Sequence, residues 1–319
     1  MKKHSRRLPA EWEPQDAVLL VWPHENTDWA PILDDALQMF DAISAAILRF
    51  QHVISIRPDA VNIPSNDTWA RDFGPITVEE NGKPLLLDFT FNGWGGKYPA
   101  ELDNVITRNL HALGALGQTP LQTVDFILEG GSIESDGEGT LLTTTECLLN
   151  PNRNPHLSTA QIEDRLHNEF GSHTILWLKH GALAGDDTNA HIDTLARLCP
   201  DKTIVYVACN DPTDEHYEDL KAMEQELQSF EGYRLHPLPW PTAKFNTDGS
   251  RLPATYTNYL VINGAVLVPT YNDPADAAAL EVIQKAFPDR EMIGIDCSTL
   301  IIQHGSLHCV TMQIPAGVL

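Results

Sequence analysis

The chain has 319 residues, of which 42% are hydrophobic and 20% charged, an ordinary composition for a globular protein. Its 44 Asp and Glu residues outnumber 21 Lys and Arg, which gives a net charge of -23. This balance argues against nucleic acid as a partner, because phosphate binding needs clustered basic residues. It favours a cationic ligand, although acidity of this kind also serves simply to keep a protein dissolved.

The N-terminus and the cysteines bear on cellular location. Residues 1–7 are basic, but residues 8–14 lack the apolar core of a signal peptide. No run approaches the roughly 18 apolar residues of a membrane span. The five cysteines include no Cys-x-x-Cys pair, and an odd number leaves at least one thiol free. We therefore expect a protein of the reduced cytoplasm that has no membrane partner.

Five segments along the chain have apolar residues at helical spacing, and each opens with proline or a capping residue. They begin near residues 31, 99, 158, 213 and 274, at steps of 55 to 68 residues. The third has Ser158 and Gln161 at the spacing of a capping box. This regular spacing predicts a repeated unit of about sixty residues.

Short strands alternate with these helices. The clearest turn is Asn81-Gly82, which joins strands expected at residues 76–78 and 85–87. Further pairs are expected at 132–134 and 140–142, 194–198 and 203–207, and 259–262 and 266–268, with single strands at 17–21, 52–56, 174–178 and 292–295. Five such units predict one domain over residues 1–319, a circular or stacked α/β array. A doubly wound α/β protein of two domains is the alternative.

Unusual polar residues keep the same period, at the start of the predicted strand pairs. Asp72, Glu129, His191 and Cys309 are separated by 57, 62 and 118 residues, which are one, one and two periods. Asp193 follows His191 on what we expect to be one face of a strand. Taken singly, Asp72 suits a turn, Glu129 a solvated loop, and His191 with Asp193 a structural ion pair. Their shared period instead predicts that they converge.

Cys309 alone among the cysteines belongs to this periodic set. We expect it to lie on a strand next to His308, which would then point to the opposite face and make a poor partner. The remaining four are expected to be small buried hydrophobes: Cys147, Cys199, Cys209 and Cys297. The sequence has no zinc-ligand spacing, phosphate-binding loop or serine nucleophile elbow. A cysteine nucleophile with histidine and carboxylates, acting without metal or cofactor, is the expected chemistry.

The chain resembles the agmatine deiminase family, within the guanidino-group modifying superfamily that includes bacterial-type peptidylarginine deiminases. The resemblance spans nearly the whole chain and is carried by five motifs in order: residues 69–75 (WARDFGP), 91–98 (FNGWGGKY), 129–132 (EGGS), 191–197 (HIDTLAR) and 308–311 (HCVT). It implies a five-bladed α/β propeller (pentein) with pseudo-fivefold repeats. Three places depart from the family pattern: Ala190 replaces the usual Gly, Gln303-His304 replaces Gly-Gly, and Met312 replaces Gln.

The resemblance also implies roles for the periodic residues. Cys309 is implied as the nucleophile and His191 as the general acid and base. Asp72 and Asp193 are implied to hold the guanidinium group, and Glu129 to orient His191. The implied reaction is hydrolysis of agmatine to N-carbamoylputrescine and ammonia through an amidino-cysteine intermediate.

The residues that meet the rest of the substrate are less sharply indicated. We expect Asp187 or its neighbour Asp186 to bind the ammonium group of agmatine, and Trp69 and Trp94 to flank the alkyl chain. Ordinary turn and core packing roles are the alternatives. Three other functions stay open: peptidylarginine deimination, amidino transfer, and guanidinium binding without turnover. A monomer and a homo-oligomer are both compatible with the sequence.

Overall fold

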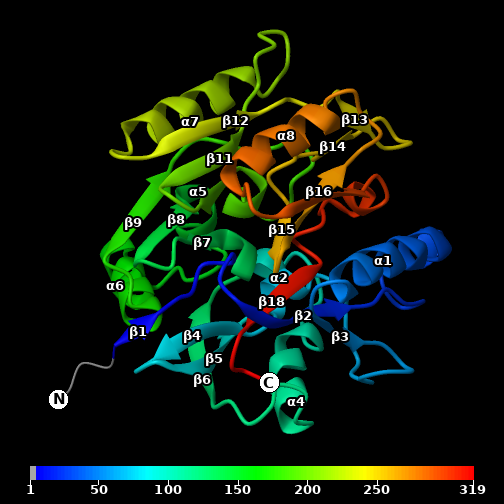
Figure 1. The fold of residues 1–319 in the computed structure, drawn as a ribbon, viewed down its shortest axis with the longest axis vertical. Helices are drawn as coiled ribbons and strands as arrows, with labels where there is room; N and C mark the ends of the chain where they lie inside the picture. Colours follow the sequence, from blue (N-terminus) through cyan, green and yellow to red (C-terminus); the bar gives the residue numbers. More distant parts are fainter. Residues whose placement is uncertain (1–4) are drawn as a thin grey trace.

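One arrangement of helix and strands recurs five times in residues 5–319, the part of the chain that the computed structural model describes (Figure 1). Two antiparallel strands are followed by a helix and by a third strand that pairs parallel with the second. Residues 1–4, the start of the basic N-terminal segment, lie outside the described part. The repeat of about sixty residues predicted from the sequence is thus confirmed in the secondary structure.

The units have the following bounds. The first unit consists of β18 (Thr311–Pro315), β2 (Gln15–Val21), α1 (Leu33–Leu48) and β3 (His52–Ile56), and the second of β4 (Ile76–Glu80), β5 (Lys83–Thr90), α4 (Ile106–Ala112) and β6 (Leu121–Ile127). The third unit consists of β7 (Ile133–Ser135), β8 (Thr140–Thr144), α6 (Thr159–Phe170) and β9 (Thr174–Leu178), and the fourth of β10 (Ala196–Cys199), β11 (Thr203–Val207), α7 (Tyr217–Ser229) and β12 (Arg234–Leu238). The fifth unit consists of β15 (Leu260–Ile262), β16 (Ala265–Thr270), α8 (Asp276–Ala286) and β17 (Glu291–Asp296). Short additional elements are β1 (Arg6–Arg7), α2 (Ala70–Phe73), α3 (Gly93–Gly96), α5 (Thr145–Leu148), β13 (Lys244–Phe245) and β14 (Arg251–Leu252).

The two ends of the chain meet in one sheet. β18, the last strand, pairs antiparallel with β2, so that Thr311 lies opposite Leu20. β2 in turn pairs parallel with β3. The C-terminal strand β18 is therefore the first strand of the unit whose other elements, β2, α1 and β3, come from the N-terminal part of the chain.

Local sequence signals explain several element boundaries. Ser158 and Gln161 form the predicted capping box at the start of α6, and Gly171 ends that helix with a left-handed φ of 66°. Asn81 and Gly82 turn β4 into β5 with φ values of 54° and 76°, both positive as a type I′ turn requires.

The sequence prediction was wrong or incomplete at three elements. α4 begins at Ile106 rather than near Pro99, because a 3-10 helix over Asp103–Val105 comes first. β6 and β12 were not predicted. β6 has Gln122, Thr123 and Asp125 among its seven residues and buries only Val124 and Phe126 fully. β12 contains Pro237, which is tolerated because β12 is an edge strand that pairs only with β11.

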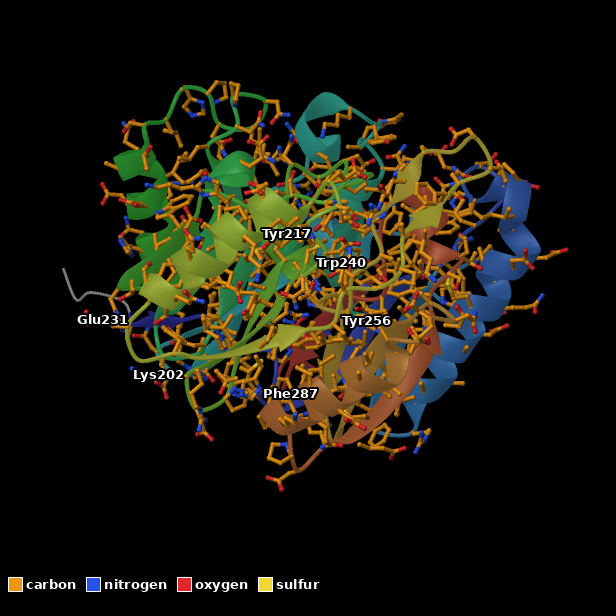
Figure 2. The ribbon with its side chains drawn as sticks, turned by 90° about the horizontal axis from the view of Figure 1, so that it is seen from above. Lys202, Tyr217, Glu231, Trp240, Tyr256 and Phe287 are labelled. Carbon is orange, nitrogen blue, oxygen red and sulfur yellow. The ribbon has the colours of Figure 1, made fainter. Side chains whose placement is uncertain are left out.

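The interior is built from strands, with helices toward the outside. Every residue of β11 is buried, whereas α1, α6 and α7 bury only one side and lie at the periphery of the ribbon (Figure 1). Figure 2 shows the same organisation from above, with Tyr217 at the start of α7 and Phe287 just beyond α8. Within residues 5–319, none of the helices is long and apolar enough to cross a membrane.

Candidate active site

Polar side chains gather from the segments that lead into the first strand of each unit. Each lies within five residues of that strand: Asp72 before β4, Glu129 before β7, Asp193 before β10, Asn258 before β15 and Cys309 before β18. A β-carbon built on Gly131 would lie 2.6 Å from His191 Nδ1, 2.9 Å from Asp72 Oδ1 and 3.0 Å from Asp193 Oδ2. The convergence predicted from the period is therefore present.

Cys309 lies in the turn just before β18 and is 5% exposed. Its Sγ is 3.4 Å from Asn258 Oδ1 and 3.9 Å from Asp193 Oδ2. The same Asn258 oxygen accepts the backbone N–H groups of His308 and Cys309. Burial raises the pKa of the Cys309 thiol well above its ordinary value, and the carboxylates of Asp193 and Asp72 raise it further. The thiol is thus protonated at neutral pH.

His191 is fully buried between two carboxylates. Asp72 Oδ1 lies 3.6 Å from Nδ1, and Glu129 Oε2 lies 4.0 Å from Nε2. Burial acts to lower the pKa of His191, but the surrounding negative groups, led by Asp72, outweigh it and raise the pKa to about 10. The imidazole therefore carries a proton at neutral pH.

The backbone before His191 explains a departure from the family pattern. Ala190 has a φ of 57°, in the left-handed region where glycine costs least. The carboxylate of Asp186 holds this turn, since it accepts the N–H groups of Thr188 and Ala190. Asp186 is thereby committed to the loop, which leaves Asp187 as the acid that faces the pocket.

Asp72 is held from two sides. Its Oδ1 accepts the N–H of Gly131 at 3.0 Å, and its Oδ2 accepts the indole N–H of Trp94 at 2.8 Å. Burial raises the pKa of Asp72, the charge of His191 opposes this, and Asp193 adds to it, so that the pKa is about 6. Asp72 is ionised at neutral pH and protonates in mild acid.

Two predictions about the surroundings of Asp193 were wrong. His191 and Asp193 do not share a strand face, because residues 192–194 form a 3-10 helix that still turns both side chains into the site. His308 and Cys309 do not lie on a strand, because both precede β18 in a turn. His308 Nδ1 is 2.8 Å from Asp193 Oδ2, and its Nε2 is 2.6 Å from Glu11 Oε2. Burial acts to raise the pKa of Asp193, but the hydrogen bond from His308 lowers it below its ordinary value.

Glu129 is paired with a residue that the sequence did not single out. The Nε of Arg153 is 3.0 Å from both carboxylate oxygens of Glu129, and both side chains are fully buried. Arg153 also donates to the carbonyl of Thr188 at 2.7 Å, in the loop that carries His191. Glu129 thus faces His191 while its hydrogen bonds go to Arg153.

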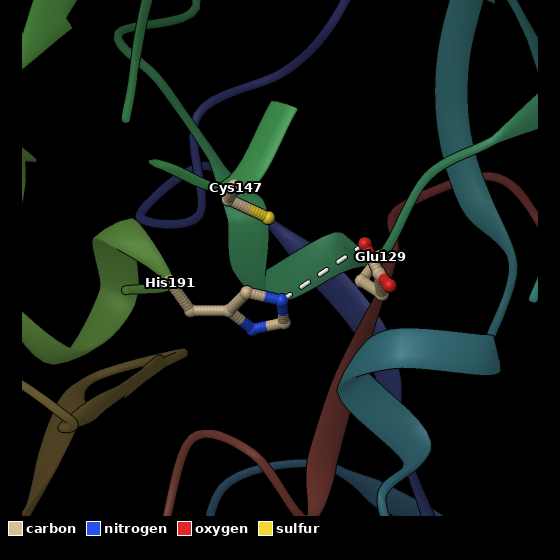
Figure 3. Close-up of side chains that lie close together, drawn as sticks. All are labelled: Glu129, Cys147 and His191. Atoms are coloured by element: carbon tan, nitrogen blue, oxygen red, sulfur yellow. Dashed lines mark ion pairs between the residues drawn. The ribbon is translucent and has the colours of Figure 1, made fainter. Parts of the chain in front are cut away.

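Cys147 also lies at this site, contrary to its predicted role as an ordinary core residue. It is buried, as expected, but its thiol lies beside the ring of His191 and the carboxylate of Glu129 (Figure 3). The sulfur, the nearest ring nitrogen and a carboxylate oxygen are all within 4.8 Å of one another. No spacing in the sequence indicated this contact.

A pocket opens from Cys309 and Asp72 toward the surface. Of the residues predicted to touch the substrate, Trp69, Trp94 and Asp187 line it. Sequence reasoning missed the other lining residues, which are Asp28, Asp67, Tyr98, Thr188, Gln303, His304 and Gly305. Tyr98 donates its hydroxyl to the Asp187 carboxylate at 2.7 Å. Gln303 and His304 place larger side chains where the family pattern expects Gly-Gly.

Several polar atoms beside the pocket-lining residues Asp72 and Cys309 are buried without a partner. Within residues 5–319 they include both ring nitrogens of His191 and Oδ1 of Asp193. Such groups are costly unless a ligand or water satisfies them. Together with Asp72 and the Cys309 thiol they form a buried set of donors and acceptors suited to a planar cation.

A sequence profile of the Porphyromonas-type peptidyl-arginine deiminases matches residues 7–315. The chain belongs to this family. A relative named agmatine deiminase, from Pseudomonas aeruginosa, is 34% identical over 97% of this chain and 95% of its own length. The chain is thus similar both to a family named for a peptide substrate and to a relative named for a small-molecule substrate.

Two solved structures of the family share the whole fold. The C. jejuni agmatine deiminase, in a cysteine-to-serine variant with substrate bound, is 40% identical, covers 100% of this chain and 99% of its own, and has a TM-score of 0.96. A Porphyromonas gingivalis protein, provisionally named an arginine deiminase, is 52% identical, covers 98% and 99%, and has a TM-score of 0.93. The mixed α/β fold described above is thus that of the agmatine deiminase structures.

Proposed function

We propose that this protein is an agmatine deiminase. The observation that carries the proposal is the charge of the pocket: four carboxylates line it, those of Asp28, Asp67, Asp72 and Asp187, and its described lining includes no Lys or Arg. A free arginine would need a cation for its carboxylate, whereas agmatine is positively charged at both ends. The family membership and the similarity to the C. jejuni enzyme support the same conclusion.

The proposed chemistry begins with the guanidinium group between Asp72 and Asp193. Charge-assisted hydrogen bonds from the guanidinium to these carboxylates fix its plane and hold its carbon before Sγ of Cys309. The incoming positive charge offsets the carboxylates that raise the Cys309 pKa, so the thiol loses its proton when substrate binds.

The second part of the reaction uses His191. Attack by the thiolate forms a tetrahedral adduct, and His191 protonates the departing ammonia. Water then attacks the amidino-thioether, with His191 taking its proton, and the ureido product and the Cys309 thiol are released. Glu129, held by Arg153, stabilises the positive charge of His191 from the side of Nε2. No cofactor enters these steps.

We further infer that the five units form one domain, a five-bladed α/β propeller around this site. Its support is that each unit supplies a site residue from the same position, just before its first strand. The pairing of β18 with β2 supplies the closure that such a ring needs.

The substrate assignment is tested with purified protein and three substrates of equal concentration: agmatine, arginine and an arginine peptide. We expect ureido product and ammonia from agmatine at a kcat/KM well above that of the other two. Higher activity on the arginine peptide would instead establish peptidylarginine deimination as the function.

The Asp187→Asn variant extends this test to the tail of the substrate. If Asp187 binds the ammonium group, its loss removes about 1.5–3 kcal/mol, or roughly tenfold to a hundredfold in agmatine binding. A neutral alkylguanidine of the same length serves as the matched control, because it lacks the ammonium group. Equal losses for both substrates would show that Asp187 does not recognise the tail.

The acid limb of the pH profile should report Asp72. Because its pKa is about 6, Asp72 holds the guanidinium above that pH and loses its charge below it. We expect kcat/KM for agmatine to fall as the pH decreases through about 6. Burial also raises the pKa of Asp67 to about 6, so Asp67→Asn is the control. An acid limb that disappears in Asp67→Asn would assign the titration to Asp67 instead.

A further inference from the structure

On the side of His191 that faces away from the substrate pocket, Glu129, Cys147 and the ring itself offer three atoms that could bind a metal ion. Nδ1 points toward Asp72, Asp193 and the reacting region, as the contacts around Gly131 show. Nε2 points toward Glu129 and Cys147 instead, and the three ligand atoms lie within 4.8 Å of one another (Figure 3). Neither ring nitrogen has a hydrogen-bond partner in the described residues, although the ring is fully buried.

These three side chains match the ligand chemistry of zinc. Imidazole nitrogen, thiolate sulfur and carboxylate oxygen bind Zn²⁺ at about 2.0–2.3 Å in tetrahedral geometry, so two ligands of one ion lie about 3.3–3.8 Å apart. The three ligand atoms lie within 4.8 Å of one another, and Nε2 of His191 is 4.0 Å from Oε2 of Glu129. Rotations that bring the ligand atoms closer by up to about 1.5 Å would therefore be needed to chelate the ion.

The surrounding groups also match those of a metal site. A histidine ligand commonly donates its second N–H to a carboxylate, which fixes the ring and its tautomer. Asp72 occupies this position, 3.6 Å from Nδ1. Arg153 holds the Glu129 carboxylate in place by its Nε. The Cys147 thiolate, Glu129 and Asp72 would together balance the two charges of the ion and the positive charge of Arg153.

We propose that Glu129, Cys147 and His191 form an inhibitory Zn²⁺ site behind the imidazole and distinct from Cys309. Binding releases the thiol proton of Cys147 and the proton on Nε2 of His191, since metal ligands must be deprotonated. The imidazole is then fixed as a neutral ligand and no longer exchanges protons with leaving group and water. Zn²⁺ should inhibit the enzyme, and a chelator should restore it.

The site is tested first by spectroscopy that does not depend on activity. Co²⁺ is titrated into metal-free Cys309→Ser protein, in which the nucleophilic thiol is absent. We expect a saturable thiolate-to-cobalt absorption band with one ion per chain. The band should vanish in Cys309→Ser/Cys147→Ser and persist in the control Cys309→Ser/Cys209→Ser. A band that is unchanged by loss of Cys147, or absent from Cys309→Ser, would overturn the proposal.

Inhibition provides a second test in the otherwise intact chain. Activity of the Cys147→Ser, Cys147→Ala and Cys209→Ser variants is measured against Zn²⁺ and normalised to each variant without metal. Loss of the Cys147 ligand should raise the half-inhibitory Zn²⁺ concentration by at least about tenfold, whereas Cys209→Ser should match the unaltered protein. Thermal unfolding identifies which Cys147 variant is folded for the comparison. Equal inhibition of all variants would place the ion at Cys309 and overturn the proposal.

Discussion

Replacing Cys309 with serine should lower kcat for agmatine by at least about 10⁴-fold, an effect of the size seen when a covalent nucleophile is removed. Serine has nearly the same shape as cysteine, but its hydroxyl is a far weaker nucleophile at neutral pH than a thiolate. Asp72 and Asp193 remain, so agmatine should still bind. Ammonia release measures turnover, and calorimetry of agmatine with the variant measures binding.

The matched control is Cys209→Ser, which replaces another buried thiol outside the site and should retain turnover. Retention is also expected for Cys199→Ser and Cys297→Ser. Cys147→Ser is left out of this control set, because its thiol lies beside His191 rather than only in the core as the sequence indicated. Mass spectrometry of acid-quenched reactions should find the amidino adduct on Cys309. An adduct on any other cysteine would contradict the assignment.

The repeat could be predicted from the sequence because it depends on local signals. Capping at Ser158 and the Asn81-Gly82 turn are decided by neighbouring residues, and both occur as predicted. The convergence of Asp72, Glu129, His191 and Cys309 could be predicted from the period alone, because equivalent residues of similar units are expected at equivalent positions in the fold. The gap of 118 residues between His191 and Cys309 is two periods, which is the signal for a further site residue that the sequence analysis did not use. Asn258 lies in this gap, 67 residues after His191 and 51 before Cys309.

What could not be predicted depends on contacts between distant segments. Arg153 reaches Glu129 across 24 residues, and His308 reaches Asp193 across 115. Neither contact has a spacing that marks it in advance. The error about His308 came from extending β18 three residues too far, since in a strand the side chains of neighbours alternate but in a turn they need not. Cys147 was misjudged because burial, which was predicted correctly, does not say which side chain lies opposite.

Gly131 allows the convergence of the site to be tested without altering any reacting group. Alanine is compatible with the backbone at this position, where φ is outside the left-handed region. Its methyl group would nevertheless lie within 3.0 Å of side-chain atoms of His191, Asp72 and Asp193. Gly130 differs, because a β-carbon there would lie 2.2 Å from the carbonyl oxygen of Arg71, so Gly130→Ala would strain the backbone.

We expect Gly131→Ala to fold but to lose at least about 10²-fold in kcat/KM, because a displacement of about 1 Å of reacting groups has effects of that size. Gly294→Ala is the control: its β-carbon would meet a methyl group of Thr270 at 3.1 Å, in a strand outside the site. Thermal unfolding and steady-state kinetics with agmatine measure the two effects separately. Near-normal kcat/KM in Gly131→Ala would show that the three side chains need not keep this arrangement, and the proposed roles of Asp72 and Asp193 as a rigid grip would then fail.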